Sequence, residues 1–222
     1  MTEKQIAPNC AKCDAKFCDN RDIQATSLPT FCPMKVATET VHNIVDLVNS
    51  NADLKKLYLA SAWVEKNAYE TVRGDITPVW PRVCEVMEFA KQLGIEKLGV
   101  AFCIGLSDEA KKVVKIFENN GFKVQSVVCK CGNVDKTRFG VPPTDKIGGS
   151  NSFEAACNPV LQAELLNQAG TGLNVTVGLC VGHDSLFFMH SKTPTTALIV
   201  KDRVTGHNPV IALYSQYHKS RL

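Results

Sequence analysis

Apolar residues recur along the chain with two different periods, and the change of period divides the sequence. Between residues 36 and 94 they lie three and four positions apart, which predicts amphipathic helices. The predicted helices cover 37–50, 52–74 and 77–94. The second is predicted to end at Gly74, and the third to begin with a Thr77 cap and Pro78 in its first turn.

From residue 95 onward, short apolar runs alternate with helical patterns. The runs predict strands at 97–103, 122–129, 173–180 and 195–202. Helices are predicted at 106–121, capped by Ser107, at 158–170, capped by Asn158 with Pro159 in first position, and at 208–218. A strand–helix–strand unit this short implies a right-handed parallel crossover. The predicted fold is therefore α/β, with a parallel sheet of about four strands and flanking helices.

Residues 1–35 follow neither period and contain too few apolar residues for a core of their own. We expect a metal site, or docking onto the rest of the chain, to order them. The predicted organisation is a cysteine-rich metal- or cluster-binding segment at 1–35, a helical layer at 36–94 and an α/β domain at 95–222. These parts are expected to form one compact unit, with a surface loop over 133–152.

Charge and motifs exclude several classes of function. The net charge of +3 is small and no Lys/Arg run is present, so neither a nucleic acid nor a membrane is an expected partner. The N-terminus has no signal-peptide pattern and no segment approaches the length of a membrane span, so we expect a cytoplasmic protein. The phosphate-binding G-x-x-x-x-G-K-[ST] loop, the G-x-S-x-G elbow and the H-E-x-x-H zinc helix are all absent from the sequence.

Ten cysteines are many for a cytoplasmic chain of 222 residues. Disulfides do not persist in that compartment, so the number favours metal, cluster or redox chemistry over structural cross-links. Some of the ten are expected to be small buried hydrophobic residues instead. Cys84 is the clearest case, because it shares a helix side with Val83, Val86 and Met87.

The first group of cysteines is spaced C-x2-C-x4-C, with a remote C-P, and consists of Cys10, Cys13, Cys18 and Cys32. Two thiolates three positions apart reach one metal from a single turn, and thiolates suit iron–sulfur clusters and zinc. A cysteine followed by proline also occurs in ferredoxin-type runs, which favours a [4Fe–4S] cluster. Zinc stays an alternative, as do free thiols or a transient disulfide between Cys10 and Cys13.

The second group follows the predicted strands. Cys103, Cys129 and Cys180 each end a strand, and parallel strand ends meet at the edge where open α/β folds bind ligands. Cys157 precedes a predicted helix start in "CNP", and His207 does so in "HNP", where free backbone N–H groups favour thiolates and anions. We therefore predict a thiol-lined pocket that holds a second metal centre, a second cluster or a small substrate. Its candidate ligands or nucleophiles are Cys103, Cys129, Cys131, Cys157 and Cys180.

Four polar residues near this edge are the candidate catalytic groups. His183 is the expected proton donor, since its pKa lies near neutrality and it stands at a helix start. Arg203 is expected to orient an anionic substrate, with His207 close by. Asp184 is a candidate acid or base, although a helix cap is the commoner role for such a residue. For Asp202 and Arg203, the favoured alternative is that they pair with each other or with neighbouring groups.

Seven short segments together resemble an uncharacterised family, domain of unknown function 1847. They are "CAKC", "FCP", "GVAFCIGL", "VVCKCG", "CNPVLQAELLN", "GLCVGHDSLF" and "VKDRVTGHNPVIALY". The resemblance spans nearly the whole chain and is densest after Cys157. It implies a metal role for the N-terminal cysteines and an origin in anaerobic bacteria or archaea, but no established reaction.

The leading hypothesis is a cytoplasmic iron–sulfur protein with redox function, of which an oxidoreductase or reductase is the enzymatic form. It would take electrons from a donor such as a ferredoxin and act on a small molecule. The alternative is a non-enzymatic module with structural zinc bound to the four N-terminal cysteines.

Overall fold

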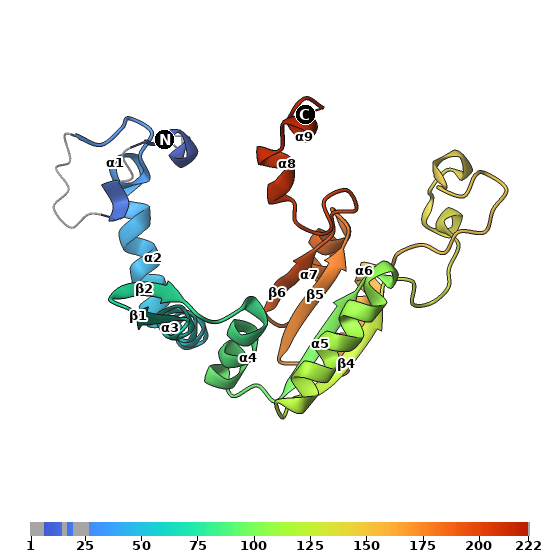
Figure 1. Ribbon diagram of the computed structural model, residues 1–222, viewed down its shortest axis with the longest axis horizontal. Helices are drawn as coiled ribbons and strands as arrows, with labels where there is room; N and C mark the ends of the chain where they lie inside the picture. Colours follow the sequence, from blue (N-terminus) through green and yellow to red (C-terminus); the bar gives the residue numbers. More distant parts are fainter. Residues whose placement is uncertain (1–6, 15–16, 20–26, 222) are drawn as a thin grey trace. The chain divides into compact units, whose positions relative to one another are not determined.

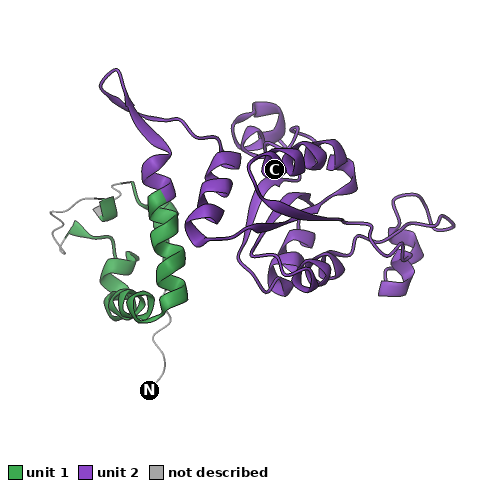
Figure 2. Ribbon diagram, turned by 90° about the horizontal axis from the view of Figure 1, so that it is seen from below, with its two compact units in different colours: residues 1–63 green, residues 64–222 purple. Residues whose placement is uncertain are grey.

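The computed structural model describes residues 7–14, 17–19 and 27–221, and the chain divides into two compact units. Unit 1 comprises residues 1–63 and unit 2 residues 64–222 (Figure 2). No helix in the described part of the chain is long and apolar enough to cross a membrane.

Unit 1 contains short turns followed by helices. The turns are η1 (Cys10–Lys12) and η2 (Phe17–Asp19), and the helices are α1 (Pro33–Val36), α2 (Thr38–Ser50) and the first part of α3 (Ala52–Asn67) (Figure 1). Asn51 separates α2 from α3, because its side-chain oxygen accepts hydrogen bonds from the Asp53 and Leu54 N–H groups (3.1 and 3.0 Å). The apolar face predicted for α2 is present, but Ile44 and Val45 on it are about half exposed (51% and 53%).

The predicted boundaries of the second and third helices are wrong. α3 ends at Asn67, and residues 68–78 form the antiparallel hairpin of β1 (Tyr69–Val72) and β2 (Asp75–Pro78). Arg73 and Gly74 make its two-residue turn, both with positive φ (54° and 92°), which is the geometry that tight hairpins favour. Thr77 and Pro78 therefore lie in a strand, and α4 (Arg82–Leu93) begins after Pro81.

The predicted parallel sheet is confirmed and belongs to unit 2. It contains β3 (Lys97–Phe102), β4 (Lys123–Val128), β5 (Leu173–Leu179) and β6 (Thr195–Val200), all parallel, in the order β4-β3-β5-β6. Every residue of β5 is buried, as expected for a strand covered on both faces.

Three helices connect the strands, and helices lie on both faces of the sheet (Figures 1 and 2). They are α5 (Ser107–Asn119), α6 (Pro159–Gln168) and α7 (His183–His190). The chain leaves β3 toward β4 but leaves β5 toward β6, so its direction across the sheet reverses between β3 and β5. The edge beyond such a reversal is where open α/β sheets bind ligands.

The predicted cap of α6 is confirmed, whereas the predicted cap of α5 is wrong. Asn158 caps α6 by accepting a hydrogen bond from the Leu161 N–H (2.9 Å), with Pro159 in first position, as predicted. Ser107 is not the cap of α5, since a 3-10 turn, η4 (Ile104–Leu106), precedes it and its hydroxyl donates to the Ile104 carbonyl. The predicted C-terminal helix is two short helices, α8 (Val210–Tyr214) and α9 (Gln216–Lys219), separated by the extended Ser215.

Buried side chains on both sides of the sheet form one core. Its largest members are Phe117 from α5, Phe187 from α7, Leu98 from β3, Leu106 from η4 and Leu166 from α6. α4 contributes Val86, Met87 and Ala90, with Cys84 packed against the edge of the core, as the sequence predicts.

The segment 130–157 is a loop with two short turns, η5 (Lys136–Phe139) and η6 (Pro143–Asp145). Its base is held by Asp135, whose carboxylate accepts hydrogen bonds from the Thr137 and Glu154 N–H groups and pairs with Lys146. These bonds lower the pKa of Asp135. At its far end the loop returns to β4, where the Asn158 N–H donates to the Cys129 carbonyl (2.8 Å).

Gly178 allows the end of β5 to pack closely against η4. Its φ is +67°, and a Cβ there would lie 2.5 Å from Leu106 Cδ2, which is fully buried. We expect Gly178→Ala to lower the free energy of unfolding by about 2–5 kcal/mol, the sum of left-handed backbone strain and overpacking. Urea denaturation measures this.

Gly140→Ala is the matched control, because Gly140 also has positive φ (+79°) but nothing within 4 Å of the added Cβ. It is expected to cost only the backbone strain, about 1–2 kcal/mol. Equal losses in the two variants would contradict the packing role of Gly178.

Candidate functional site

Cys10, Cys13, Cys18 and Cys32 line one cavity of about 160 Å³ in unit 1. The Cys13 N–H donates to the Cys10 carbonyl (3.0 Å), so these two thiols extend from one turn. Cys32 stands directly before α1 and is held by a hydrogen bond from its N–H to the Pro29 carbonyl (3.0 Å). The other lining residues are apolar: Pro29, Phe31, Pro33 and Met34.

The strand-end cysteines lie at the carboxyl edge of the sheet in unit 2. Cys103 follows β3, and its N–H donates to the Val177 carbonyl of β5 (3.1 Å). Cys129 follows β4, and its N–H donates to the Phe102 carbonyl of β3 (2.8 Å). The parallel ladder thus continues one residue past each strand, which fixes both cysteines side by side.

Cys157 reaches the same edge from the loop. The Asn158 N–H donates to the Cys129 carbonyl (2.8 Å), so the backbone before α6 is bonded to the end of β4. The side chain of Cys129 is hydrogen-bonded to both Cys103 and Cys157, and its sulfur also accepts the Ile104 N–H (3.3 Å). We call Cys103, Cys129 and Cys157, with their partners His183 and Lys201, the thiol cluster.

Protons are unevenly distributed in the thiol cluster. The Cys129 S–H, the Gly105 N–H and Lys201 lower the pKa of Cys103 to about 5, although burial opposes this. Hydrogen bonds to Cys103 and Cys157, together with burial, raise the pKa of Cys129. Cys129 therefore keeps its proton at neutral pH and shares it between two flanking thiolates.

Cys157 and His183 form an ion pair. The Cys129 S–H and His183 lower the pKa of Cys157 to about 4, with a further contribution from the charge of Lys130. In return the Cys157 thiolate raises the pKa of His183, aided by the charges of Cys103 and Asp184. A thiolate beside an imidazolium is a nucleophile with a proton donor in place.

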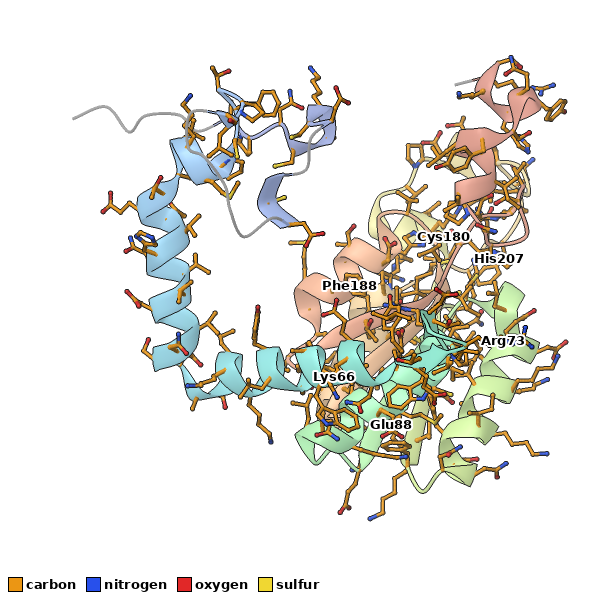
Figure 3. The ribbon with its side chains drawn as sticks, turned by 60° about the vertical axis from the view of Figure 1, so that its left-hand side comes forward. Lys66, Arg73, Glu88, Cys180, Phe188 and His207 are labelled. Carbon is orange, nitrogen blue, oxygen red and sulfur yellow. The ribbon has the colours of Figure 1, made fainter. Side chains whose placement is uncertain are left out.

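Cys180 joins this edge through different contacts. It follows β5, and its carbonyl accepts the His183 N–H at the start of α7 (2.9 Å). The sulfur of Cys180, which is labelled in Figure 3, accepts a hydrogen bond from Arg203 Nη2 (3.0 Å). Among the described residues, no ion pair joins Arg203 to Asp202. Arg203 is otherwise exposed.

Three other predicted site residues, Asp184, His207 and Cys131, have the following local surroundings in the structure. Asp184 is not the cap of α7, which is Gly182; its carboxylate accepts the Ser185 N–H within the first turn. His207, labelled in Figure 3, has positive φ, and its Nδ1 accepts the Asp202 N–H (3.1 Å). The expected likeness of "HNP" to "CNP" is wrong, because Pro209 and not Asn208 caps α8. For Cys131, burial raises the pKa.

Lys201 and Gln162 were missed from the sequence. Lys201 directly follows β6 at the same edge as the cysteines, and Gly105 leaves room for it: a Cβ there would lie 3.1 Å from Lys201 Nζ. Gln162 is fully buried on α6, and its Nε2 donates to the Phe102 and Val127 carbonyls (3.2 and 2.7 Å). The position of Lys201 at a strand end was a usable signal, whereas nothing in the sequence distinguishes Gln162.

Within residues 7–14, 17–19 and 27–221, no group of three or more Cys, His, Asp or Glu has the geometry to hold a single metal ion. All ten cysteines lie in these ranges and are free thiols.

Comparison with known proteins adds relatives but no activity. A family model described as "Protein of unknown function (DUF1847)" matches residues 32–198. An uncharacterized protein of Methanocaldococcus jannaschii is 37% identical over 213 residues, which is 96% of this chain and 97% of that protein. No solved structure matches this chain. The matched range contains Cys32 and every strand-end cysteine, whereas Cys10, Cys13 and Cys18 precede it.

The ion pair predicts how Cys157 responds to pH. Because alkylation requires the thiolate and the pKa of Cys157 is about 4, its rate with iodoacetamide should be nearly flat from about pH 5.5 to pH 8. An ordinary thiol, with a pKa of about 8.5, accelerates roughly tenfold per pH unit over this range. Cleavage at Glu154 and Glu164 separates Cys157 from Cys180 for mass spectrometry.

His183→Gln should raise the pKa of Cys157 and slow its alkylation most at the acidic end of this range. His190→Gln is the matched control, since His190 lies at the exposed far end of the same helix. A rate for Cys157 that rises steadily to pH 8 in the native protein would contradict the ion pair.

Proposed function

Given that this chain belongs to the DUF1847 family, whose description assigns no function, we propose that it is a cytoplasmic iron–sulfur redox protein. The observation that carries the proposal is the single cavity lined by Cys10, Cys13, Cys18 and Cys32. The cytoplasmic location is supported by the ten cysteines, because a reducing compartment keeps so many thiols from forming disulfides.

The four N-terminal cysteines would hold a [4Fe–4S] cluster. One zinc ion draws its four thiolates to about 2.3 Å from a single point. Sulfurs that line a cavity of about 160 Å³ suit a larger inorganic core, which supports a cluster over zinc. The cluster, when bound, supplies one-electron chemistry. The apolar lining residues Pro29, Phe31, Pro33 and Met34 would limit solvent access, which tunes the reduction potential.

The second part of the proposal concerns the thiol cluster, whose cysteines act as nucleophiles and not as ligands. Cys157 is half-buried and paired with His183, so it can attack a small electrophile while His183 supplies a proton. Cys103 and Cys129 are nearly inaccessible (8% and 2% exposed), so they would act on Cys157 and not directly on the substrate. Arg203 would orient an anionic substrate.

An electron donor such as a ferredoxin is the proposed partner. The proposal requires external reducing equivalents for repeated turnover, and a small iron–sulfur carrier supplies them one at a time. A nucleic acid and a membrane remain outside the proposal, since the net charge of +3 includes no basic run.

Metal analysis tests the N-terminal site. After anaerobic purification, the chain should contain about four iron and four sulfide and show the visible absorption and reduced-state EPR signal of such a cluster. Replacing Cys13 or Cys32 by Ser should remove most of the iron, because each supplies one of the four thiolates. Cys84→Ala is the control and should retain the full content, since Cys84 packs against the core.

Stoichiometric zinc without iron or sulfide in the anaerobic preparation would overturn the cluster. It would support the structural zinc module instead.

A further inference from the structure

We propose that Cys157 and Cys129 form a dithiol–disulfide couple that reduces low-molecular-weight disulfides with anionic substituents. The inference rests on the nucleophilic role proposed for the thiol cluster and is independent of the N-terminal cysteines.

Geometry makes Cys129 the partner of Cys157. The Cys129 side chain is hydrogen-bonded to the Cys157 sulfur, and the Asn158 N–H bond to the Cys129 carbonyl (2.8 Å) holds the two backbones together. Forming a disulfide therefore requires the two sulfurs to close from hydrogen-bond contact to a bond of about 2.05 Å.

Exposure decides the order of attack. A substrate reaches Cys157, which is half-buried, but not Cys129, which is 2% exposed. Cys129 can attack only a sulfur already inside the thiol cluster, and that is the role of a resolving cysteine. Cys103 has a third role: it accepts the Cys129 S–H hydrogen bond and can take that proton.

The first step is attack of the Cys157 thiolate on one sulfur of the substrate disulfide. The substrate S–S bond breaks, a mixed disulfide forms on Cys157, and His183 gives its proton to the departing thiolate. Loss of the negative charge on Cys157 removes one of the two thiolates that hold the proton on Cys129.

In the second step Cys129 passes its proton to Cys103 and attacks the Cys157 sulfur. The bond from Cys157 to the substrate sulfur breaks, and the second substrate thiol leaves with the proton from Cys103. The substrate gains two electrons and two protons, and the protein is left with a Cys129–Cys157 disulfide and a neutral His183.

Charge at the edge favours anionic substituents. His183, Lys201 and Lys130 act on the thiolates, and the exposed Arg203 donates to the neighbouring Cys180. Asp184 acts on His183 from the same turn, but its carboxylate is engaged by the Ser185 N–H. Arg203 is exposed, so a bound substrate can reach its guanidinium group beside Cys180.

The test mixes the reduced, anaerobic full chain with an equal amount of oxidized glutathione, whose substituents are anionic, and blocks free thiols with iodoacetamide. We expect release of two thiols per chain and a disulfide between peptides containing Cys129 and Cys157. Cleavage after Lys130 and Lys146 places the two cysteines in different peptides, and cleavage at Glu164 removes Cys180. A disulfide that instead joins Cys129 to Cys103, or Cys157 to Cys180, overturns the proposal.

Two variants separate the two roles. Cys129→Ser should release one thiol and stop as a glutathione adduct on Cys157, because no resolving sulfur remains. Cys157→Ser should slow thiol release roughly tenfold or more, since the accessible thiolate is gone. Cys84→Ala, which removes a thiol packed against the core, is the control and should behave as the native chain. Full release of two thiols by Cys129→Ser, with circular dichroism unchanged, overturns the resolving role.

Cystamine, a cationic disulfide, tests the substrate class. We expect it to react roughly tenfold more slowly than oxidized glutathione at low salt, and Arg203→Gln to reduce that difference. Equal rates overturn the preference for anionic substituents.

Iron and sulfide are measured in the same samples. Disulfide formation in a Cys32→Ser protein that lacks iron upholds this inference even if the proposed N-terminal cluster is absent. Failure of the reaction in an iron-loaded native chain overturns the inference alone.

Discussion

The backbone ladder of the parallel sheet continues one residue beyond β3 and β4, and the chemistry at the sheet edge depends on this extension. The Cys103 N–H donates to β5 and the Cys129 N–H donates to β3, so two thiols are fixed at neighbouring strand ends. The Asn158 N–H then adds Cys157 to the same edge. Because these are main-chain bonds, the sheet holds the backbones of all three cysteines at one edge.

Three thiols at hydrogen-bond contact cannot all ionise, since like charges at that distance oppose one another. The structure resolves this by leaving the proton on Cys129, which has a thiolate on either side, and by placing His183 and Lys201 opposite the two thiolates. As a result, the thiolate of Cys157 is accessible to a substrate, whereas Cys129 is protonated and inaccessible. That difference in access and charge is what distinguishes an attacking cysteine from a resolving one.

The two cysteine sites differ in their physical character. The N-terminal thiols line a cavity whose other walls are apolar. The thiol cluster instead has cations and hydrogen-bond donors in contact with its sulfurs. An apolar cavity suits an inorganic core that brings its own charge, whereas the polarised edge suits reaction with a small molecule.

The sequence by itself determined the α/β class, the four strands and the Asn158 cap of α6, because strand runs, helical periods and caps are local signals. It also placed Cys103, Cys129 and Cys180 at strand ends, since parallel strands end at one edge. It failed at residues 68–78, where a turn at Arg73 and Gly74 ends the helical pattern in a hairpin. Only the tertiary structure decided which side chains meet: Cys157 with Cys129, Lys201 with Cys103, and Arg203 with Cys180 but not Asp202. Those contacts depend on loop closure and strand order, which no local pattern encodes.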